Sequence, residues 1–92
     1  MRTIILKQTH CPSCDAQKMF LHATTQNKYQ DTIVEIVKED NEEMFAKWVD
    51  IVGANQTPTT IFVNENMQPV QIIHGFKAGD LKAALEKHFP NI

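Results

Sequence analysis

The chain has 92 residues, of which 42% are hydrophobic and 22% charged, and it carries a formal net charge of −2. A chain of this size holds one core, so we expect a single domain over 1–92, and the apolar content excludes a disordered chain. The small negative charge and the lack of any basic run argue against partners such as nucleic acid or an acidic membrane.

The N-terminal stretch Met1–Leu6 contains too short an apolar run for a signal peptide or a membrane span. We therefore expect a cytoplasmic protein. Because the cytosol is reducing, a cysteine pair there is more often catalytic or metal-binding than a structural crosslink.

The first predicted elements are a strand over Thr3–Lys7 and a helix that begins at Pro12 and runs to about Asn27. Proline suits the first helical position because its missing N–H would have no partner there. The helical spacing of four apolar residues predicts a buried face. These residues are Ala16, Met19, Phe20 and Ala23.

A second strand is predicted over Thr32–Val37, where β-branched residues dominate. Asp40 and Glu43 have the spacing of a capping box and predict the start of a second helix, whose exit suits Gly53. We interpret the acidic group over 39–43 as a solvated helix start. The apolar stripe that follows predicts core packing rather than a ligand site. It consists of Met44, Phe45, Trp48, Val49 and Val52.

Two further strands are predicted over Thr59–Val63 and Val70–Ile73, joined by a polar turn over 64–69. This link is too short for a crossover, so the two strands should pair antiparallel. A final helix should place four residues on one face, namely Leu81, Ala84, Leu85 and His88. Phe20 and Phe62 are further core candidates.

The element order, βαβ followed by ββα, predicts an α/β domain. The first half requires parallel strands and the second half a hairpin. A mixed four-stranded sheet flanked by three helices, which cover both faces, satisfies both requirements.

The only two cysteines form Cys11-Pro12-Ser13-Cys14 at a junction of strand and helix, which indicates dithiol–disulfide chemistry. A helix N-terminus presents free backbone N–H groups and a partial positive charge, which favour thiolate over thiol. We therefore expect Cys11 to be an exposed nucleophile with a pKa below the ~8.5 of a free thiol. Cys14, one turn further in, is expected to be more buried and to act as the resolving thiol. An inert buried pair is the alternative.

Three separated motifs resemble the thioredoxin superfamily over nearly the whole chain. They are the cysteine pair, the turn Thr57-Pro58-Thr59 before a strand, and the stretch Ile73-His74-Gly75-Phe76-Lys77. The resemblance implies the thioredoxin fold and a disulfide reductase that needs no cofactor and no metal. It also implies a cis bond at Thr57-Pro58 beside the cysteines.

Within that superfamily the chain is similar to glutaredoxins and to the glutaredoxin-sized redoxins that serve ribonucleotide reductase. Glutathione-using members usually have two adjacent glycines where this chain has Gly75-Phe76, and their aspartate lies one residue before Asp80. Thioredoxins usually have a tryptophan and a buried carboxylate where this chain has His10 and Ile5.

The resemblance implies a substrate-binding set of Pro12, Ser13, Thr57, Pro58, Gly75 and Phe76. Phe76 should lie on a loop beside the active site, where it meets a partner protein or caps the last helix. His10 and Lys7 are candidates to lower the pKa of Cys11 through their positive charge, opposed by Asp15.

The partners expected are a disulfide-containing protein substrate and a reductant, either a flavin-dependent thioredoxin reductase or glutathione, with the chain acting as a monomer. Three other functions remain open. They are a glutathione-dependent glutaredoxin, a soft-metal carrier that binds Cu(I) or zinc through the same cysteines, and a binding module with vestigial chemistry.

Overall fold

A computed structural model describes residues 1–26, 28 and 30–89. In chain order its elements are β1 (Arg2–Lys7), α1 (Pro12–Thr25), a 3-10 turn η1 (Gln30–Thr32), β2 (Ile33–Val37), α2 (Glu42–Val52), β3 (Thr59–Val63), β4 (Pro69–His74) and α3 (Ala78–His88). This order confirms the predicted βαβ and ββα halves.

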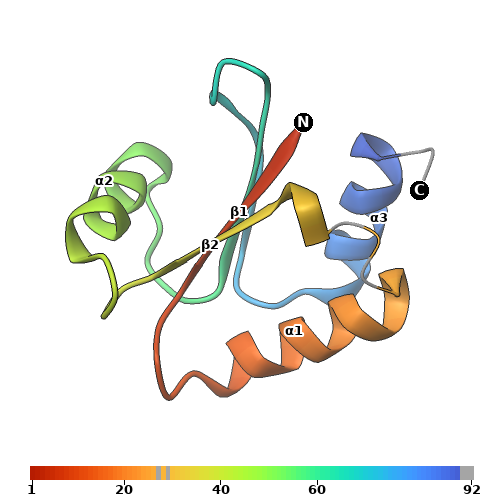
Figure 1. Cartoon of the computed structure of the whole chain (residues 1–92), viewed down its shortest axis with the longest axis horizontal. Helices are drawn as coiled ribbons and strands as arrows, with labels where there is room; N and C mark the ends of the chain where they lie inside the picture. The colour runs from red at the N-terminus through yellow and green to blue at the C-terminus, as the bar shows by residue number, and fades with distance from the viewer. Residues whose placement is uncertain (27, 29, 90–92) are drawn as a thin grey trace.

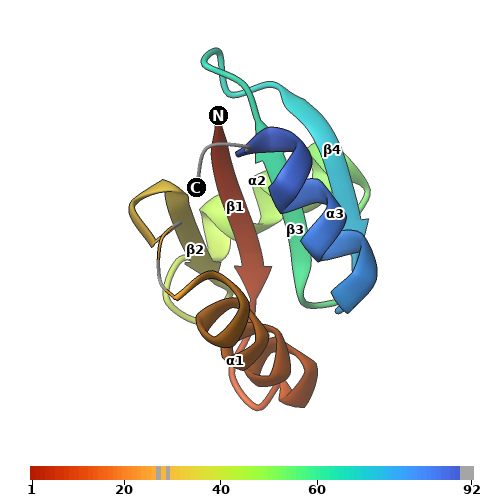
Figure 2. The same cartoon turned by 90° about the vertical axis from the view of Figure 1, so that its right-hand side faces the viewer.

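The strands form one mixed four-stranded sheet in the order β2-β1-β3-β4. β1 runs parallel to β2 and antiparallel to β3, and β3 and β4 pair as the predicted antiparallel hairpin. Helix α2 covers one face of the sheet, and α1 and α3 cover the other (Figure 1). Figure 2 shows α1 and α3 together in front of the strands, with α2 behind them.

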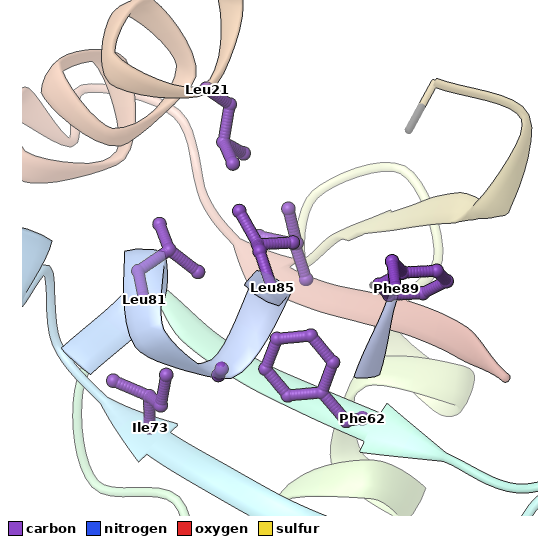
Figure 3. Packing of buried hydrophobic residues seen from close by; sticks show 8 residues of the cluster. Leu21, Phe62, Ile73, Leu81, Leu85 and Phe89 are labelled. Atoms are coloured by element: carbon purple, nitrogen blue, oxygen red, sulfur yellow. The ribbon is translucent and has the colours of Figure 1, made fainter. Parts of the chain in front are cut away.

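The two central strands supply both hydrophobic cores because successive side chains of a strand point to opposite faces. Ile5 and Phe62 face α1 and α3, where they pack with Leu21, Leu81 and Leu85 (Figure 3). On the other face, the α2 side chains pack against residues of β1 and β3, among them Ile4, Leu6, Ile61 and Val63. β3 is buried along its whole length.

The predicted buried face of α1 is wrong. Met19 is 72% exposed, and Ala16 and Ala23 are also exposed. The helix instead buries Cys14, Gln17, Leu21 and Thr25. Half of that face is polar, and its polar side chains are satisfied internally: Gln17 Nε2 donates to Thr60 Oγ1 at 2.9 Å, and Thr25 Oγ1 donates to the Leu21 carbonyl at 2.6 Å.

The ends of several elements also differ from the prediction, among them β1, which begins one residue earlier at Arg2, and β4, which is one residue longer at each end. α1 ends at Thr25, followed by Gln26 in the left-handed region at φ 53°, and Asn27 lies outside the described residues. β2 begins at Ile33 because Thr32 belongs to the 3-10 turn. The cap of α2 is Asn41, whose side chain accepts from the Met44 N–H at 3.1 Å, so the capping box at Asp40 is wrong by one residue.

Other expectations for the helices are confirmed. Gly53 ends α2 in the left-handed region at φ 66°. In α3, Leu81, Ala84 and Leu85 are buried, and the His88 ring stacks on Phe62 with centroids 4.9 Å apart. Phe20 is half-buried against the same core. Within the described residues, no helix has the length and apolar character needed to cross a membrane.

Candidate active site

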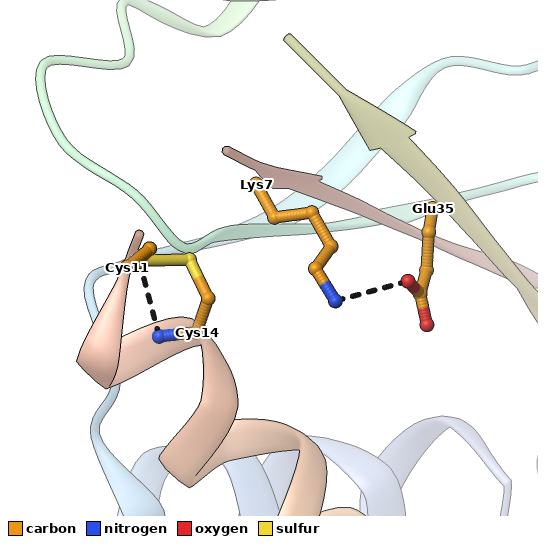
Figure 4. A network of polar contacts seen from close by, with 4 residues as sticks. All are labelled: Lys7, Cys11, Cys14 and Glu35. Atoms are coloured by element: carbon orange, nitrogen blue, oxygen red, sulfur yellow. Dashed lines mark hydrogen bonds and ion pairs between the residues drawn. A yellow bond between two sulfur atoms is a disulfide. The ribbon is translucent and has the colours of Figure 1, made fainter. Parts of the chain in front are cut away.

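Cys11 and Cys14 form a disulfide at the N-terminus of α1, with their Cα atoms 5.2 Å apart (Figure 4). Cys11 is the N-cap residue, and its Sγ accepts a hydrogen bond from the Cys14 backbone N–H at 3.1 Å. This N–H and the positive end of the helix dipole stabilise negative charge on the Cys11 sulfur once the disulfide is reduced.

Both cysteines are buried, with Cys11 7% and Cys14 4% exposed. The structure therefore differs from the expectation of an exposed Cys11. The reason is the segment before β3, since the carbonyl oxygen and Oγ1 of Thr57 lie 3.7 and 3.5 Å from the Cys11 sulfur. A disulfide sulfur carries no proton, so the Thr57 hydroxyl is the donor in the second contact.

The bond between Thr57 and Pro58 is cis, as predicted. Ser13 Oγ donates to the Thr57 carbonyl at 3.3 Å, which connects the start of α1 to this loop. The Gly75 N–H donates to the Pro58 carbonyl at 2.8 Å, which connects the end of β4 to the same loop. Four residues of the predicted substrate-binding set are thus brought together around Cys11, and Pro12 lies exposed beside it.

Gly75 is required by its surroundings. Its φ is +79°, a backbone conformation that residues with a side chain rarely adopt. A Cβ at this position would lie 2.8 Å from Gln56 Oε1. The glycine therefore allows the chain to turn away from β4 in close contact with the loop that holds Thr57.

Phe76 is half-buried and packs against the core between α1 and α3. Its ring lies 5.7 Å from that of Phe20, tilted by 58°. Phe76 therefore anchors the loop after β4 to α1, and only part of its ring is left on the surface for a partner.

Lys7, a candidate to lower the pKa of Cys11, forms an ion pair with a carboxylate. Its Nζ lies 3.0 Å from Glu35 Oε2 in β2 (Figure 4). Both side chains line, together with Cys14, a narrow cavity of about 20 Å³. The ion pair therefore lies on the side of Cys14. The negative charge of Glu35 offsets part of the positive charge that Lys7 presents to Cys11.

The sequence analysis missed Glu35. It found Ile5 where thioredoxins usually have a buried carboxylate, but Glu35 is the register partner of Ile5 on the neighbouring strand. Its carboxylate lines the cavity beside Cys14 from β2, although Glu35 is an exposed residue rather than a buried one. The available signal was a single acidic residue inside the β-branched run Ile33-Val34-Glu35-Ile36.

The loop between β1 and α1 is fixed by a second carboxylate. The backbone N–H of Thr9 donates to Glu39 Oε1 at 2.9 Å, and this bond lowers the pKa of Glu39 below its usual value. His10, which follows, is exposed and has a left-handed φ of 55°. Glu39 is therefore more than the solvated helix start that the sequence suggested.

Metal ligands are not grouped in the part of the chain that the structure describes. There, no three side chains of histidine, cysteine, aspartate or glutamate lie where they would hold one ion.

No family model matches the sequence of this chain, and no curated protein matches it in sequence. Among solved structures, thioredoxin f2 of Chlamydomonas reinhardtii is similar, with a TM-score of 0.72 and 17% identity over 98% of this chain and 80% of that one. Spinach chloroplast thioredoxin f has a TM-score of 0.68 and 20% identity over 92% and 72%. A thioredoxin of Malassezia sympodialis has a TM-score of 0.66 and 22% identity over 94% and 72%. The chain therefore has the thioredoxin fold, as its motifs predicted.

Proposed function

We propose that this chain is a thiol–disulfide oxidoreductase that reduces disulfides of other proteins in the cytoplasm. The observation that carries the proposal is the Cys11–Cys14 disulfide at the start of α1, with Thr57 in contact with the Cys11 sulfur. A reversible dithiol needs two sulfurs within bonding reach, a group that stabilises a thiolate, and a surface that receives the substrate.

The cycle starts from the reduced chain. The Cys11 thiolate attacks one sulfur of the substrate disulfide, which forms a mixed disulfide and releases the other substrate sulfur as a thiolate. The Cys14 thiolate then attacks the Cys11 sulfur, releases the second substrate thiolate and closes the Cys11–Cys14 disulfide. Two electrons pass from the chain to the substrate, and the two released thiolates take up protons.

Cys11 is assigned the attacking role because its sulfur accepts from the Cys14 N–H and lies beside the Thr57 hydroxyl. The Thr57 carbonyl lies next to the same sulfur and suits backbone pairing with an extended substrate. Ser13, Pro58 and Gly75 hold this loop in place.

Cys14 is assigned the resolving role, and it needs a proton acceptor. At 4% exposure it has little access to bulk water. The Glu35 carboxylate lines the same cavity, whose volume of about 20 Å³ suffices for one water. Glu35, held by Lys7, is therefore placed to accept the Cys14 proton through such a water when Cys14 attacks the mixed disulfide.

A flavin-dependent thioredoxin reductase is the proposed reductant, in preference to glutathione. The support is Phe76 in place of a second glycine after Gly75, together with its packing on Phe20, which fills the space beside that turn. The choice of reductant is tested by measuring turnover of a disulfide substrate with each reductant system in turn. Faster recycling of the Cys11–Cys14 disulfide by glutathione than by thioredoxin reductase would reject it.

The proposed activity is tested with insulin reduction in the presence of dithiothreitol. The wild type should accelerate the reaction, Cys11→Ser should not, and Met19→Ala, which changes an exposed residue of α1, should match the wild type. A wild type no faster than dithiothreitol alone would reject the function. Stoichiometric copper or zinc in protein purified without added metal would favour the carrier instead.

A further inference from the structure

A groove lies directly beside the Thr57 contact. Its volume is about 280 Å³, and its lining comes from the β1–α1 loop, from α2 and from the segment before Pro58. The lining residues are Gln8, Phe45, Val49, Ala54, Asn55, Gln56 and Thr57. Because Thr57 also touches the Cys11 sulfur, the groove lies within reach of a residue next to a substrate cysteine that is held at Cys11.

The groove offers apolar contact and hydrogen bonds, but no charge. Phe45, Val49 and Ala54 supply the apolar part, and the side-chain amides of Gln8, Asn55 and Gln56 both donate and accept. Its volume is slightly below the ~300 Å³ at which pockets for small molecules begin, so it suits one or two residues of a polypeptide.

Negative charge gathers next to the groove. Glu39 binds the N–H of Thr9, which follows the groove residue Gln8, and that bond lowers the pKa of Glu39, so its carboxylate stays charged. The stretch 38–43 leads into α2 and holds four carboxylates against a single lysine. Glu42 lies three residues before the groove residue Phe45 and so on the same side of α2, whereas Asp40 lines a separate cavity. Lys7 lines the cavity beside Cys14, where it is paired with Glu35.

This distribution disfavours a ligand carboxylate. A carboxylate placed in the groove would meet no cation among the lining residues, and the Glu39 carboxylate is bound to the residue that follows Gln8 of the lining. Desolvating a charge without a partner is costly, whereas an amide or apolar group fits the lining, and a cation beyond it would be attracted to the acidic stretch.

We propose that the groove selects the substrate: it receives an uncharged residue next to the reactive cysteine of a polypeptide that carries basic residues further along. Peptides with carboxylates beside the cysteine, glutathione included, are discriminated against at this step. The inference rests on the proposed oxidoreductase function, since it concerns a substrate attacked by Cys11.

The test uses disulfides of short blocked peptides with the cysteine flanked by glutamine, by glutamine followed by lysine, or by glutamate. The reduced chain should react fastest with the lysine-containing peptide. It should react with the glutamate peptide about two- to fivefold more slowly than with the glutamine peptide, the effect of one unfavourable charge pair near a surface.

Two variants locate the effect. Asn55→Lys introduces a cation into the groove and should raise the glutamate-to-glutamine rate ratio about two- to fivefold, whereas Asn66→Lys, the same change at the exposed β3–β4 turn, should leave the ratio unchanged. Glu39→Gln keeps an acceptor for Thr9 and should reduce the advantage of the lysine peptide, with Glu86→Gln on α3 as its control. Rate ratios cancel any general change in Cys11 reactivity.

The two levels of the proposal fail differently. If no peptide and no insulin is reduced, the oxidoreductase function is wrong. If all three peptides react within twofold of one another, or Asn55→Lys and Asn66→Lys behave alike, the selection by the groove is wrong while the oxidoreductase function stands.

Discussion

The hydroxyl of Thr57 lies 3.5 Å from the Cys11 sulfur, although 46 positions separate the two residues in the chain. Cys11 is the N-cap of α1 and follows β1 after the short loop 8–10, and Thr57 precedes β3, the antiparallel neighbour of β1. Leu6 and Thr59 are register partners, so the chain leaves β1 and enters β3 at the same end of the sheet. Strand pairing therefore builds the site.

Thr57→Val tests the hydroxyl contact. Valine keeps the shape of threonine but donates no hydrogen bond, so the Cys11 thiolate loses a stabilising partner. We expect alkylation of Cys11 in the reduced protein by iodoacetamide at neutral pH to slow by about three- to tenfold, as for loss of one hydrogen bond of ordinary strength. Thr24→Val, a change at an exposed position of α1, is the control. Equal alkylation rates for both variants would show that the Thr57 hydroxyl does not stabilise the Cys11 thiolate.

Glu35→Gln tests the proton acceptor of Cys14. Glutamine still accepts a hydrogen bond from Lys7 but is a far weaker base. The first step, attack by Cys11, should keep its rate, while resolution by Cys14 should slow by about 100-fold, at the low end of general-base effects. Rapid acid quench followed by mass spectrometry would show the mixed disulfide accumulate. Glu86→Gln on α3 serves as control, and unchanged resolution would exclude Glu35 as the acceptor.

Gly75→Ala tests the close approach between β4 and the Thr57 loop. The added Cβ meets Gln56 and the residue keeps a positive φ, so we expect a loss of about 2 kcal/mol or more in the free energy of unfolding. Gly53→Ala has a positive φ but open space around the Cβ, and it should lose only about 1 kcal/mol. Urea denaturation of both variants separates strain from the clash, and equal losses would show that Gln56 moves aside freely.

His88 predicts a pH dependence of stability. Burial, with a further contribution from the Lys87 charge, lowers the pKa of His88 below its ordinary 6.5. The unfolded chain therefore binds a proton more readily than the folded one as the pH falls below about 6.5. Stability from neutral His88 is present above that pH and is lost on acidification.

Urea denaturation at pH 7.5 and 5.5 measures this loss, which should be smaller in His88→Gln than in the wild type. His22→Gln, a change at an exposed position of α1, is the control. An identical acid loss in wild type and His88→Gln would contradict the assignment.

The fold was largely predictable because its strands and helices carry clear hydrophobic periods, and because three separated motifs occur in the order of a known fold. The buried face of α1 could not be predicted, because Gln17 and Thr25 are buried with internal hydrogen bonds that no hydrophobic pattern reveals. Glu35 was missed for a different reason. It is exposed, as an acidic residue in a strand usually is, and only the pairing of β1 with β2 places its carboxylate at the cavity that Cys14 also lines.

The central claim is that Cys11 attacks a substrate disulfide and Cys14 resolves the product, and Cys14→Ser tests it most directly. This variant can form a mixed disulfide but cannot release it, because resolution needs a second sulfur one helical turn away. Non-reducing electrophoresis of cell extract should show Cys14→Ser in disulfide-linked complexes that dithiothreitol dissociates. Cys11→Ser and the double variant should show no such complexes. Complexes with Cys11→Ser alone would reverse the two roles, and no complexes with either single variant would contradict the oxidoreductase function.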